Sequence, residues 1–321
     1  MTHVLVTGAR GFVGRGLVPF LAAQGVGGIA TGREPPPGLP AGWRGLVRGD
    51  VLGGTADLEP VDTVVHLEVK QHVPRPTAAD DAEFRRVNVA GTGEWLDWAT
   101  RRGVRRFVFV STIKAVASAA APQTEAAPLA PNTPYGRSKA AAEGLVADWA
   151  AADPGRQAVI LRPAPVYGPG NEANLAAFVR QIVAGRPCLI GRGDTRKSVV
   201  SRTNLAAAIA FAATRGHVGC EVFNVSDRET FSLAELAATI ASLASAPPPR
   251  SIPALLATLA APVGDVIETL SGRDFPLTTA RLRAIRETSV FPCDKLLAAG
   301  FEHPQSTRDG LAEMLAWLDA H

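Results

Sequence analysis

Short apolar runs rich in β-branched residues alternate with helix-forming stretches through the first half of this 321-residue chain. The runs predict strands over residues 3–7, 28–31, 45–48, 63–67, 106–111 and 157–162, and the helical stretches include 12–24, 81–102 and 135–151. The strands lack the polar alternation of a half-exposed sheet, so both of their faces must be covered. This order predicts an α/β fold with a doubly wound parallel sheet, the Rossmann architecture.

The glycine-rich segment TGARGFVG, residues 7–14, follows the first strand and opens the first helix. Glycine lets this turn tighten, lets the backbone approach a pyrophosphate, and lets the helix pack closely on the strand. The N-terminus of the helix offers unpaired N–H groups to the same phosphate. The segment therefore predicts a dinucleotide site, although an ordinary tight turn is the alternative. Its binding residues would be Gly8, Arg10, Gly11, Phe12, Val13 and Gly14.

The second strand ends without the Asp or Glu that usually binds the ribose hydroxyls of NAD, and Arg33 follows it instead. Arg33 can pair with a ribose phosphate, and Arg10 could form the other side of that clamp. We therefore expect NADP(H) to be favoured, with NAD(H) possible, while two solvated loop arginines are the alternative. Asp50 and Val51, at the end of the third strand, fit a contact with the adenine edge.

Tyr135 and Lys139 stand four residues apart at the start of the helix predicted over 135–151. This spacing puts both side chains on one helical face, a turn apart. A nearby ammonium favours the phenolate and so lowers the phenol pKa from about 10 toward neutrality. Such a tyrosine is a general acid/base for an alcohol oxygen, although the spacing is also compatible with an exposed tyrosine at a helix start.

Two hydroxyl residues, Ser111 and Thr112, follow the fifth predicted strand. Ligands of parallel α/β sheets bind at the carboxyl ends of the strands, which is where these hydroxyls should lie. Either one can hydrogen-bond an oxygen that the tyrosine holds. A simple role in capping the following turn is the alternative.

Together these segments resemble the extended short-chain dehydrogenase/reductase family, which includes the NAD(P)-dependent nucleotide-sugar epimerases, dehydratases and reductases. The resemblance covers nearly the whole chain. It continues through VHL at 65–67, NVAGT at 88–92, VSTIK at 110–114, PYGRSK at 134–139 and LRPAPVYGP at 161–169. The order and spacing of so many motifs are more specific than any single one.

The resemblance implies a role for each matching residue. Tyr135 would be the acid/base, and Lys139 would bind the nicotinamide ribose and tune that tyrosine. Thr112 matches the catalytic hydroxyl of the family, with Ser111 as the second candidate. The cofactor would be bordered by Leu67, Pro163 and Val166.

Three further residues would contact the nucleotide diphosphate of the substrate: Asn174, Arg196 and Lys197. Lys197 stands where many members of the family place an arginine. A lysine offers the charge without the bidentate fork of a guanidinium. For Asn174, a helix-capping role is the alternative.

The chain also departs from the family pattern beside the cofactor. Glu68 and Val69 occur where the family usually has two alanines against the cofactor. A carboxylate there would repel the phosphates unless it turns away or pairs with a base such as Lys70. Ala, Val and Ala at 115–117 replace the usual Val-Tyr-Gly on the substrate side, which points to an atypical substrate.

The leading functional hypothesis is hydride transfer to or from a nucleotide-sugar. A 4-epimerase would retain its cofactor through the reaction, and a 4-keto reductase would release it after each turnover. One alternative is an NADP-dependent ketoreductase of a steroid-, flavonoid- or acyl-like ketone. Another is a non-catalytic NADP-binding regulatory protein.

The pattern of elements changes after Arg162 to helices with isolated strands at 188–190 and 221–225. We expect residues 1–165 to form the NAD(P)-binding Rossmann domain, with its sheet completed by about 201–226. Residues 166–200 and 227–321 would form a smaller, mainly helical substrate-binding lobe. A homodimer through the helices at 81–102 and 135–151 is usual in the family.

Composition narrows the possible partners and compartment. The net charge of +3 comes from scattered arginines, which argues against a nucleic-acid partner. The three cysteines lie far apart and no histidine has a partner at ligand spacing, so we expect no metal, reduced thiols and a cytoplasmic protein. No apolar run reaches membrane-spanning length, so we expect no membrane partner. His72 follows the cofactor-facing loop but reads better as a packed or solvated residue.

Overall fold

The computed structural model describes residues 3–71, 73, 76–117, 119, 121–171, 174–271, 275 and 277–321, with the backbone alone for Asn174. Seven strands form one sheet in the order β3-β2-β1-β4-β5-β6-β11, and every neighbouring pair is parallel. The strands are β1 (His3–Thr7), β2 (Gly27–Gly32), β3 (Trp43–Val47), β4 (Thr63–His66), β5 (Arg106–Val110), β6 (Gln157–Pro163) and β11 (Gly219–Val225). This arrangement confirms the predicted doubly wound parallel sheet.

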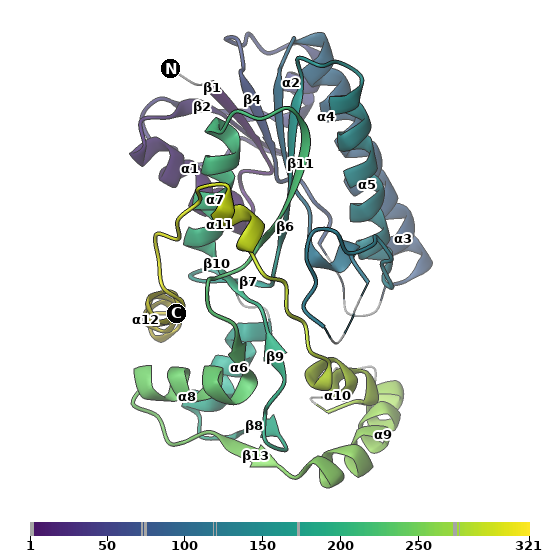
Figure 1. Cartoon of the computed structure of the whole chain (residues 1–321), viewed down its shortest axis with the longest axis vertical. Helices are drawn as coiled ribbons and strands as arrows, with labels where there is room; N and C mark the ends of the chain where they lie inside the picture. Colours follow the sequence, from purple (N-terminus) through teal and green to yellow (C-terminus); the bar gives the residue numbers. More distant parts are fainter. Residues whose placement is uncertain are drawn as a thin grey trace.

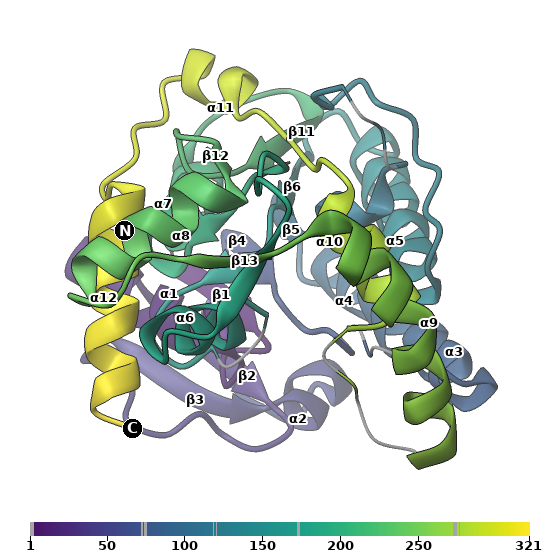
Figure 2. The same cartoon turned by 90° about the horizontal axis from the view of Figure 1, so that it is seen from below.

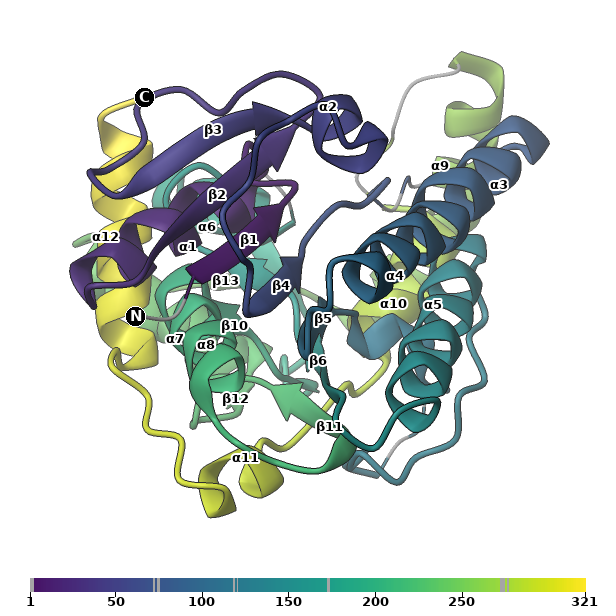
Figure 3. The same cartoon turned by 90° about the horizontal axis from the view of Figure 1, so that it is seen from above.

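Helices cover both faces of the sheet, which explains why its strands are apolar throughout. Helices α1 (Phe12–Ala23) and α7 (Arg202–Thr214) pack on one face, and α4 (Gly91–Arg101) and α5 (Pro134–Ala151) pack on the other (Figure 3). The helix expected over 81–102 is instead three consecutive segments: α3 (Ala78–Phe84), the π-helical η1 (Arg85–Ala90) and α4. A short α2 (Arg48–Gly53) follows β3.

A smaller group of helices and two-stranded sheets lies below the carboxyl edge of the main sheet (Figures 1 and 2). Its helices are α6 (Asn174–Val183), α8 (Leu233–Leu243), α9 (Ala254–Ser271) and α10 (Thr279–Arg286). Its strand pairs are β7 (Val166–Tyr167) with β10 (Val200–Ser201), β9 (Arg196–Lys197) with β12 (Phe231–Ser232), and β8 (Pro187–Ile190) with β13 (Arg250–Ile252). The chain ends with α11 (Asp294–Ala298) and α12 (Thr307–Asp319), and α12 packs against α8.

A buried carboxylate joins this lower group to the helices on the sheet. One oxygen of Asp227 accepts hydrogen bonds from the Tyr167 hydroxyl at 2.8 Å and from Thr307 Oγ1 at 3.2 Å. The other oxygen accepts from the Ser201 backbone N–H at 3.0 Å and from Asn204 Nδ2 at 2.7 Å. Because the carboxylate is 2% exposed and fully partnered, it fixes β7, α7 and α12 relative to one another.

Candidate active site

The glycine-rich loop between β1 and α1 needs its glycines for close backbone approach. Gly8 has a φ of +65°, and a Cβ there would lie 2.8 Å from the Glu68 backbone nitrogen. A Cβ on Gly14 would lie 2.6 Å from the backbone of Ala9. Gly11 donates its N–H to the Gly8 carbonyl at 3.0 Å and caps the start of α1 at Phe12. The loop therefore forms the tight turn and the exposed helix start that a pyrophosphate requires.

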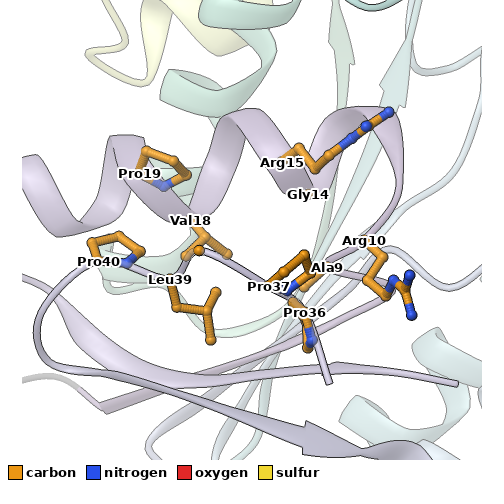
Figure 4. A pocket seen from close by; sticks show the side chains of 11 residues that line it. Ala9, Arg10, Gly14, Arg15, Val18, Pro19, Pro36, Pro37, Leu39 and Pro40 are labelled. Atoms are coloured by element: carbon orange, nitrogen blue, oxygen red, sulfur yellow. The ribbon is translucent and has the colours of Figure 1, made fainter. Parts of the chain in front are cut away.

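A cavity of about 220 Å³ lies beside this loop, between α1 and the proline-rich segment 36–40 (Figure 4). Arg10 and Arg15 both line it. Arg10 also forms an ion pair with Glu34, which lowers the pKa of that carboxyl, and Arg33 stands exposed next to Glu34. Sequence reasoning missed Glu34 because it lies two residues beyond the end of β2, outside the usual acidic position.

Helix α5 begins where its sequence dictates. The Thr133 hydroxyl accepts a hydrogen bond from the Gly136 N–H at 3.0 Å, and Pro134 occupies the first turn, where a missing N–H costs nothing. A Cβ on Gly136 would collide with the Lys114 carbonyl, so glycine lets the helix start rest against that backbone. This contact brings Tyr135 to the carboxyl end of β5.

Tyr135 and Thr112 meet at that end of the sheet. The Thr112 hydroxyl lies close enough to Tyr135 to lower the pKa of its phenol, and Thr112 Oγ1 accepts a hydrogen bond from the Lys114 N–H at 3.2 Å. Thr112 caps the 3₁₀ helix η2 (Ile113–Ala115). The Tyr135 ring packs edge-on against Phe84, with 6.0 Å between centroids. The structure therefore brings together two of the residues that the sequence selected for catalysis.

The expectation that Lys139 lowers the pKa of Tyr135 is wrong for these side chains by themselves. Burial raises the pKa of Tyr135 to about 12, and the nearby Thr112 hydroxyl opposes that shift only in part. Lys139 is 1% exposed, with its ammonium 4.0 Å from the centroid of the Phe109 ring. Burial lowers the pKa of Lys139 to about 7, against the opposing charge of Glu143. Desolvation of both groups therefore outweighs the attraction that the sequence suggested.

Ser111 belongs to a different cluster. Its hydroxyl donates to Glu143 Oε1 at 2.5 Å, and Arg162 on β6 binds the same carboxylate, with Nη2 2.7 Å from Oε2. All three side chains are buried. The Ser111 hydroxyl is thus occupied in a structural network, which favours Thr112 as the catalytic hydroxyl. Glu143 lies four residues after Lys139, but nothing in the sequence alone marked Arg162 as its partner.

A chain of hydrogen bonds runs behind the site from β1 to α5. Thr7 Oγ1 lies 2.8 Å from His66 Nδ1, and His66 Nε2 lies 3.1 Å from Thr92 Oγ1. Thr92 in turn donates to the Asn88 carbonyl at 2.7 Å, and Asn88 Nδ2 donates to Ser138 Oγ at 2.9 Å. Burial holds the pKa of His66 well below its usual value, so the ring is neutral. The NVAGT motif therefore ties the ends of β1 and β4 to the helix that carries Tyr135.

Glu68 avoids the cofactor loop by pairing with a base, although that base is Arg48 and not Lys70. Arg48 Nε lies 2.9 Å from Glu68 Oε1, and the Trp95 indole donates to Oε2 at 3.0 Å. Lys70 instead pairs with Glu83 at 2.7 Å. The sequence could not rank the two bases, because Arg48 follows β3 and Glu68 follows β4, and β1 and β2 lie between these strands in the sheet.

Other residues predicted to border the cofactor lie near the same edge of the sheet. Leu67 follows β4, Pro163 ends β6, and Val166 begins β7. Asp50 is exposed on α2. The side chain of Val51 is fully buried among the apolar residues between the sheet and helices α4 and α5.

The predicted substrate residues are engaged elsewhere or lie outside the description. The Lys197 ammonium donates to the carbonyls of Ala284, at 2.9 Å, and Glu287, at the end of α10. Arg196 donates to the Thr230 carbonyl. The side chain of Asn174 and all of His72 fall outside the described residues, and the substrate roles stay predictions. Across the described ranges, no group of three or more His, Cys, Asp or Glu gathers as a metal site would require.

Known proteins share this sequence pattern and fold. A model of the NAD dependent epimerase/dehydratase family matches residues 4–226. The chain is 26% identical to the N-acetyl-alpha-D-glucosaminyl-diphospho-ditrans,octacis-undecaprenol 4-epimerase of Escherichia coli O157:H7, over 81% of this chain and 78% of the relative. It is 33% identical to the UDP-glucose 4-epimerase of Vibrio cholerae over 74% of each chain. The solved structure of MoeE5 in complex with UDP-glucose and NAD is similar, with a TM-score of 0.75 and 25% identity over 99% of both chains.

Two glycines of α5 provide a matched test of how the helix start is positioned. In Gly136→Ala the added methyl group collides with the Lys114 carbonyl, and we expect the free energy of unfolding to fall by about 1–3 kcal/mol. In Gly144→Ala the methyl group meets nothing within 4 Å, and better helix propensity should raise the free energy of unfolding by about 0.5–1 kcal/mol. Urea denaturation measures both. Equal effects in the two variants would contradict the close approach at Gly136.

Proposed function

Because the chain belongs to the NAD-dependent epimerase/dehydratase family, within the extended short-chain dehydrogenases/reductases, we propose that it is a nucleotide-sugar 4-epimerase or 4-keto reductase. The observation that carries this proposal is the proximity of the Tyr135 and Thr112 side chains at the carboxyl edge of the sheet, with Lys139 one turn further along α5. The named relatives act on sugars joined to a nucleotide or polyprenol diphosphate, which supports a diphosphate-linked sugar as substrate.

The glycine-rich loop fits the nicotinamide cofactor of the family, because Gly8 and Gly14 pack against the backbones of Glu68 and Ala9 where a Cβ would clash, which gives the tight turn that a pyrophosphate requires. When bound, the nicotinamide supplies the hydride donor or acceptor and, in its oxidised form, a positive charge that favours the Tyr135 phenolate. Lys139, one turn further along α5, would hold the nicotinamide ribose. Phe12 and Val13 would lie against the cofactor at the start of α1.

In our mechanism Thr112 holds the reacting oxygen of the sugar, and Tyr135 moves its proton. With a pKa raised to about 12, Tyr135 is a phenol at neutral pH and can donate its proton directly to a ketone oxygen. In the oxidative direction it must first lose that proton, which the positive charge of the oxidised nicotinamide would favour. Thr112 and Tyr135 can therefore serve both the oxidation and the reduction that make up an epimerisation.

The residues beside Thr112 support an epimerase or reductase over a dehydratase. Eliminating water from a sugar needs a further acid and base beyond the tyrosine. Thr112 is followed by the buried Ile113 and by Lys114, whose pKa burial lowers, and not by a carboxylate. This segment supplies no carboxylate to take or deliver the second proton.

We also propose a preference for NADP(H) over NAD(H). Its support is the exposed Arg33 at the end of β2 together with Arg10 and Arg15 around the neighbouring cavity. Glu34 opposes the preference, because it already neutralises part of the charge of Arg10. Asp50, on α2, would contact the adenine.

The remaining proposals concern the organisation of the protein. We propose that residues 1–165, with about 201–226, bind the cofactor, and that 166–200 and 227–321 bind the sugar nucleotide. A homodimer would form through the helices at 81–102, which comprise most of α3 with η1 and α4, and at 135–151, which is α5. The three cysteines are free thiols, which supports a reducing cytoplasm.

Substitutions at the two tyrosines of the chain test catalysis and stability separately. We expect Tyr135→Phe to lower kcat about 100-fold to 10,000-fold on a UDP-hexose or its 4-keto derivative, because the proton donor is lost. Tyr167→Phe leaves the buried Asp227 short of one hydrogen bond and should lower the free energy of unfolding by about 1–3 kcal/mol while kcat changes little. Steady-state kinetics and urea denaturation give the two readouts. Undiminished kcat in Tyr135→Phe would overturn the catalytic assignment.

The cofactor preference is tested by removing the charge at the end of β2. Arg33→Ala should raise the Kd for NADPH about tenfold or more and leave the Kd for NADH nearly unchanged, because only NADPH carries the ribose phosphate. Arg44→Ala removes the same charge from an exposed site on β3 and serves as the control. Isothermal titration measures both constants. Wild-type protein that binds NADPH no better than NADH, with no loss in Arg33→Ala, would refute the preference.

Epimerase and reductase differ in whether the cofactor leaves. We expect an epimerase to be purified with tightly held NAD, which denaturation releases for identification by mass spectrometry. A reductase would give an empty or exchanging site and would consume NADPH with a 4-keto sugar nucleotide. Protein that retains no cofactor and turns over neither a UDP-hexose nor its 4-keto derivative would contradict both activities.

A further inference from the structure

Helix α9 is packed the opposite way from an ordinary surface helix. Its small residues face the protein: Ala257, Ala261 and Gly264 are buried. Its large apolar residues face outward, each between 40% and 83% exposed. We call them the apolar stripe: Leu255, Leu256, Leu259, Val263, Val266, Ile267 and Leu270. A surface helix normally buries its large apolar residues and exposes its polar ones, whereas none of the described residues covers the outer face of this helix.

The orientation of α9 is fixed by close backbone contact. A Cβ on Gly264 would collide with the Leu277 carbonyl, so the helix can approach the segment before α10 only with glycine on that side. The acidic residues of α9 are held on the same side. Asp265 Oδ1 accepts from the Thr279 N–H at 3.0 Å, and Glu268 Oε2 accepts from the Phe275 N–H at 3.1 Å. The outer face is therefore left without a charge.

The apolar stripe is continuous. At about 100° per residue its seven members cover an arc of about 120°, and no polar residue falls within it. In the rest of the described chain, the exposed large apolar residues are Leu129, Val183 and Val218, which lie apart on other elements. A patch of this size on one helix marks an interaction surface.

Helices α9 and α10 lie side by side (Figure 2), and a basic groove runs between them along one edge of the stripe. This groove encloses about 560 Å³ and is lined by Thr258, Ala261, Pro262, Thr279, Leu282, Arg283, Arg286 and Glu287. Arg283 and Arg286 are exposed, and α10 itself carries three arginines and no acid. Arg286 lies against the start of α9, where Nη2 donates to the Thr258 hydroxyl at 2.8 Å. Cationic groups beside an apolar helical face match the phosphates and acyl chains at a lipid surface.

We propose that α9 and α10 bind the surface of an anionic lipid bilayer. The apolar stripe lies among the acyl chains at the interface, and Arg283 and Arg286 hold lipid phosphates beside it. Helix α9, with 18 residues and a mean hydropathy of 1.3, is long and apolar enough to cross a membrane, but its inner face packs on the protein, so it lies along the surface. This inference replaces the expectation of no membrane partner and does not depend on the identity of the sugar.

Co-sedimentation with lipid vesicles tests the proposal on the full chain. We expect the wild-type protein to sediment with vesicles of phosphatidylcholine and phosphatidylglycerol, and to bind less to phosphatidylcholine alone or at high salt. Val263→Asp places a charge in the middle of the stripe and should weaken binding about tenfold or more. Val218→Asp makes the same change at a site that is 87% exposed on the other part of the molecule, and should bind as the wild type does.

A second variant tests the basic groove. Arg283→Glu should remove most of the preference for phosphatidylglycerol and leave the weaker binding to phosphatidylcholine, which depends on the stripe. An unchanged urea midpoint in each variant shows that the fold is intact. Wild-type protein that ignores both kinds of vesicle would overturn the proposal, and so would equal binding by Val263→Asp. A dimer that Val263→Asp dissociates, without any binding to vesicles, would assign the stripe to a second copy of the chain and also overturn it.

Discussion

Helix α5 carries the proposed acid/base, and a buried ion pair fixes it against the sheet. Glu143 and Arg162 are 3% and 5% exposed in their side chains, and the Ser111 hydroxyl completes the set of donors to the carboxylate. Removing one partner of such a pair leaves an uncompensated buried charge and typically costs about 3–5 kcal/mol. The pair joins α5 to the ends of β5 and β6. The proximity of Tyr135 to Thr112 depends on that spacing, because Tyr135 lies on α5 and Thr112 follows β5.

The same packing determines the protonation of the site. Lys139 is buried one turn before Glu143, and its pKa falls to about 7. An unfolded chain keeps the lysine proton up to about pH 10.4, so between these values the unfolded state binds more protons than the folded one. Stability contributed by this group therefore rises with pH across that window and is lost as the pH falls through 7. Because burial brings the pKa of Lys139 to about 7, its charge changes with pH around neutrality. The same burial lowers the free energy of unfolding.

The sequence predicted strands, helices and turns, which depend on residues near one another in the chain. It did not predict the ion pairs between residues that are far apart in the sequence. The strand over His3–Thr7 and the glycine turn after it follow from apolar runs and backbone geometry, and the structure has both. The choice of Arg48 over Lys70 by Glu68, and the pairing of Glu34 with Arg10, depend on which loop ends meet in the folded chain. The raised pKa of Tyr135 depends on burial, which no spacing of residues in the sequence expresses.

The exposed apolar stripe of α9 could not be predicted from the sequence either. Its mean hydropathy is the same whichever face turns outward, so the sequence alone does not reveal an exposed stripe. Gly264 decides the rotation of the helix, because it is the residue that can rest against the Leu277 carbonyl without a clash. With that contact made, Asp265 and Glu268 fall on the protein side and Leu259 and Val263 face solvent. A larger residue at 264 would lift α9 away from the segment before α10 and separate the stripe from the arginines of the groove.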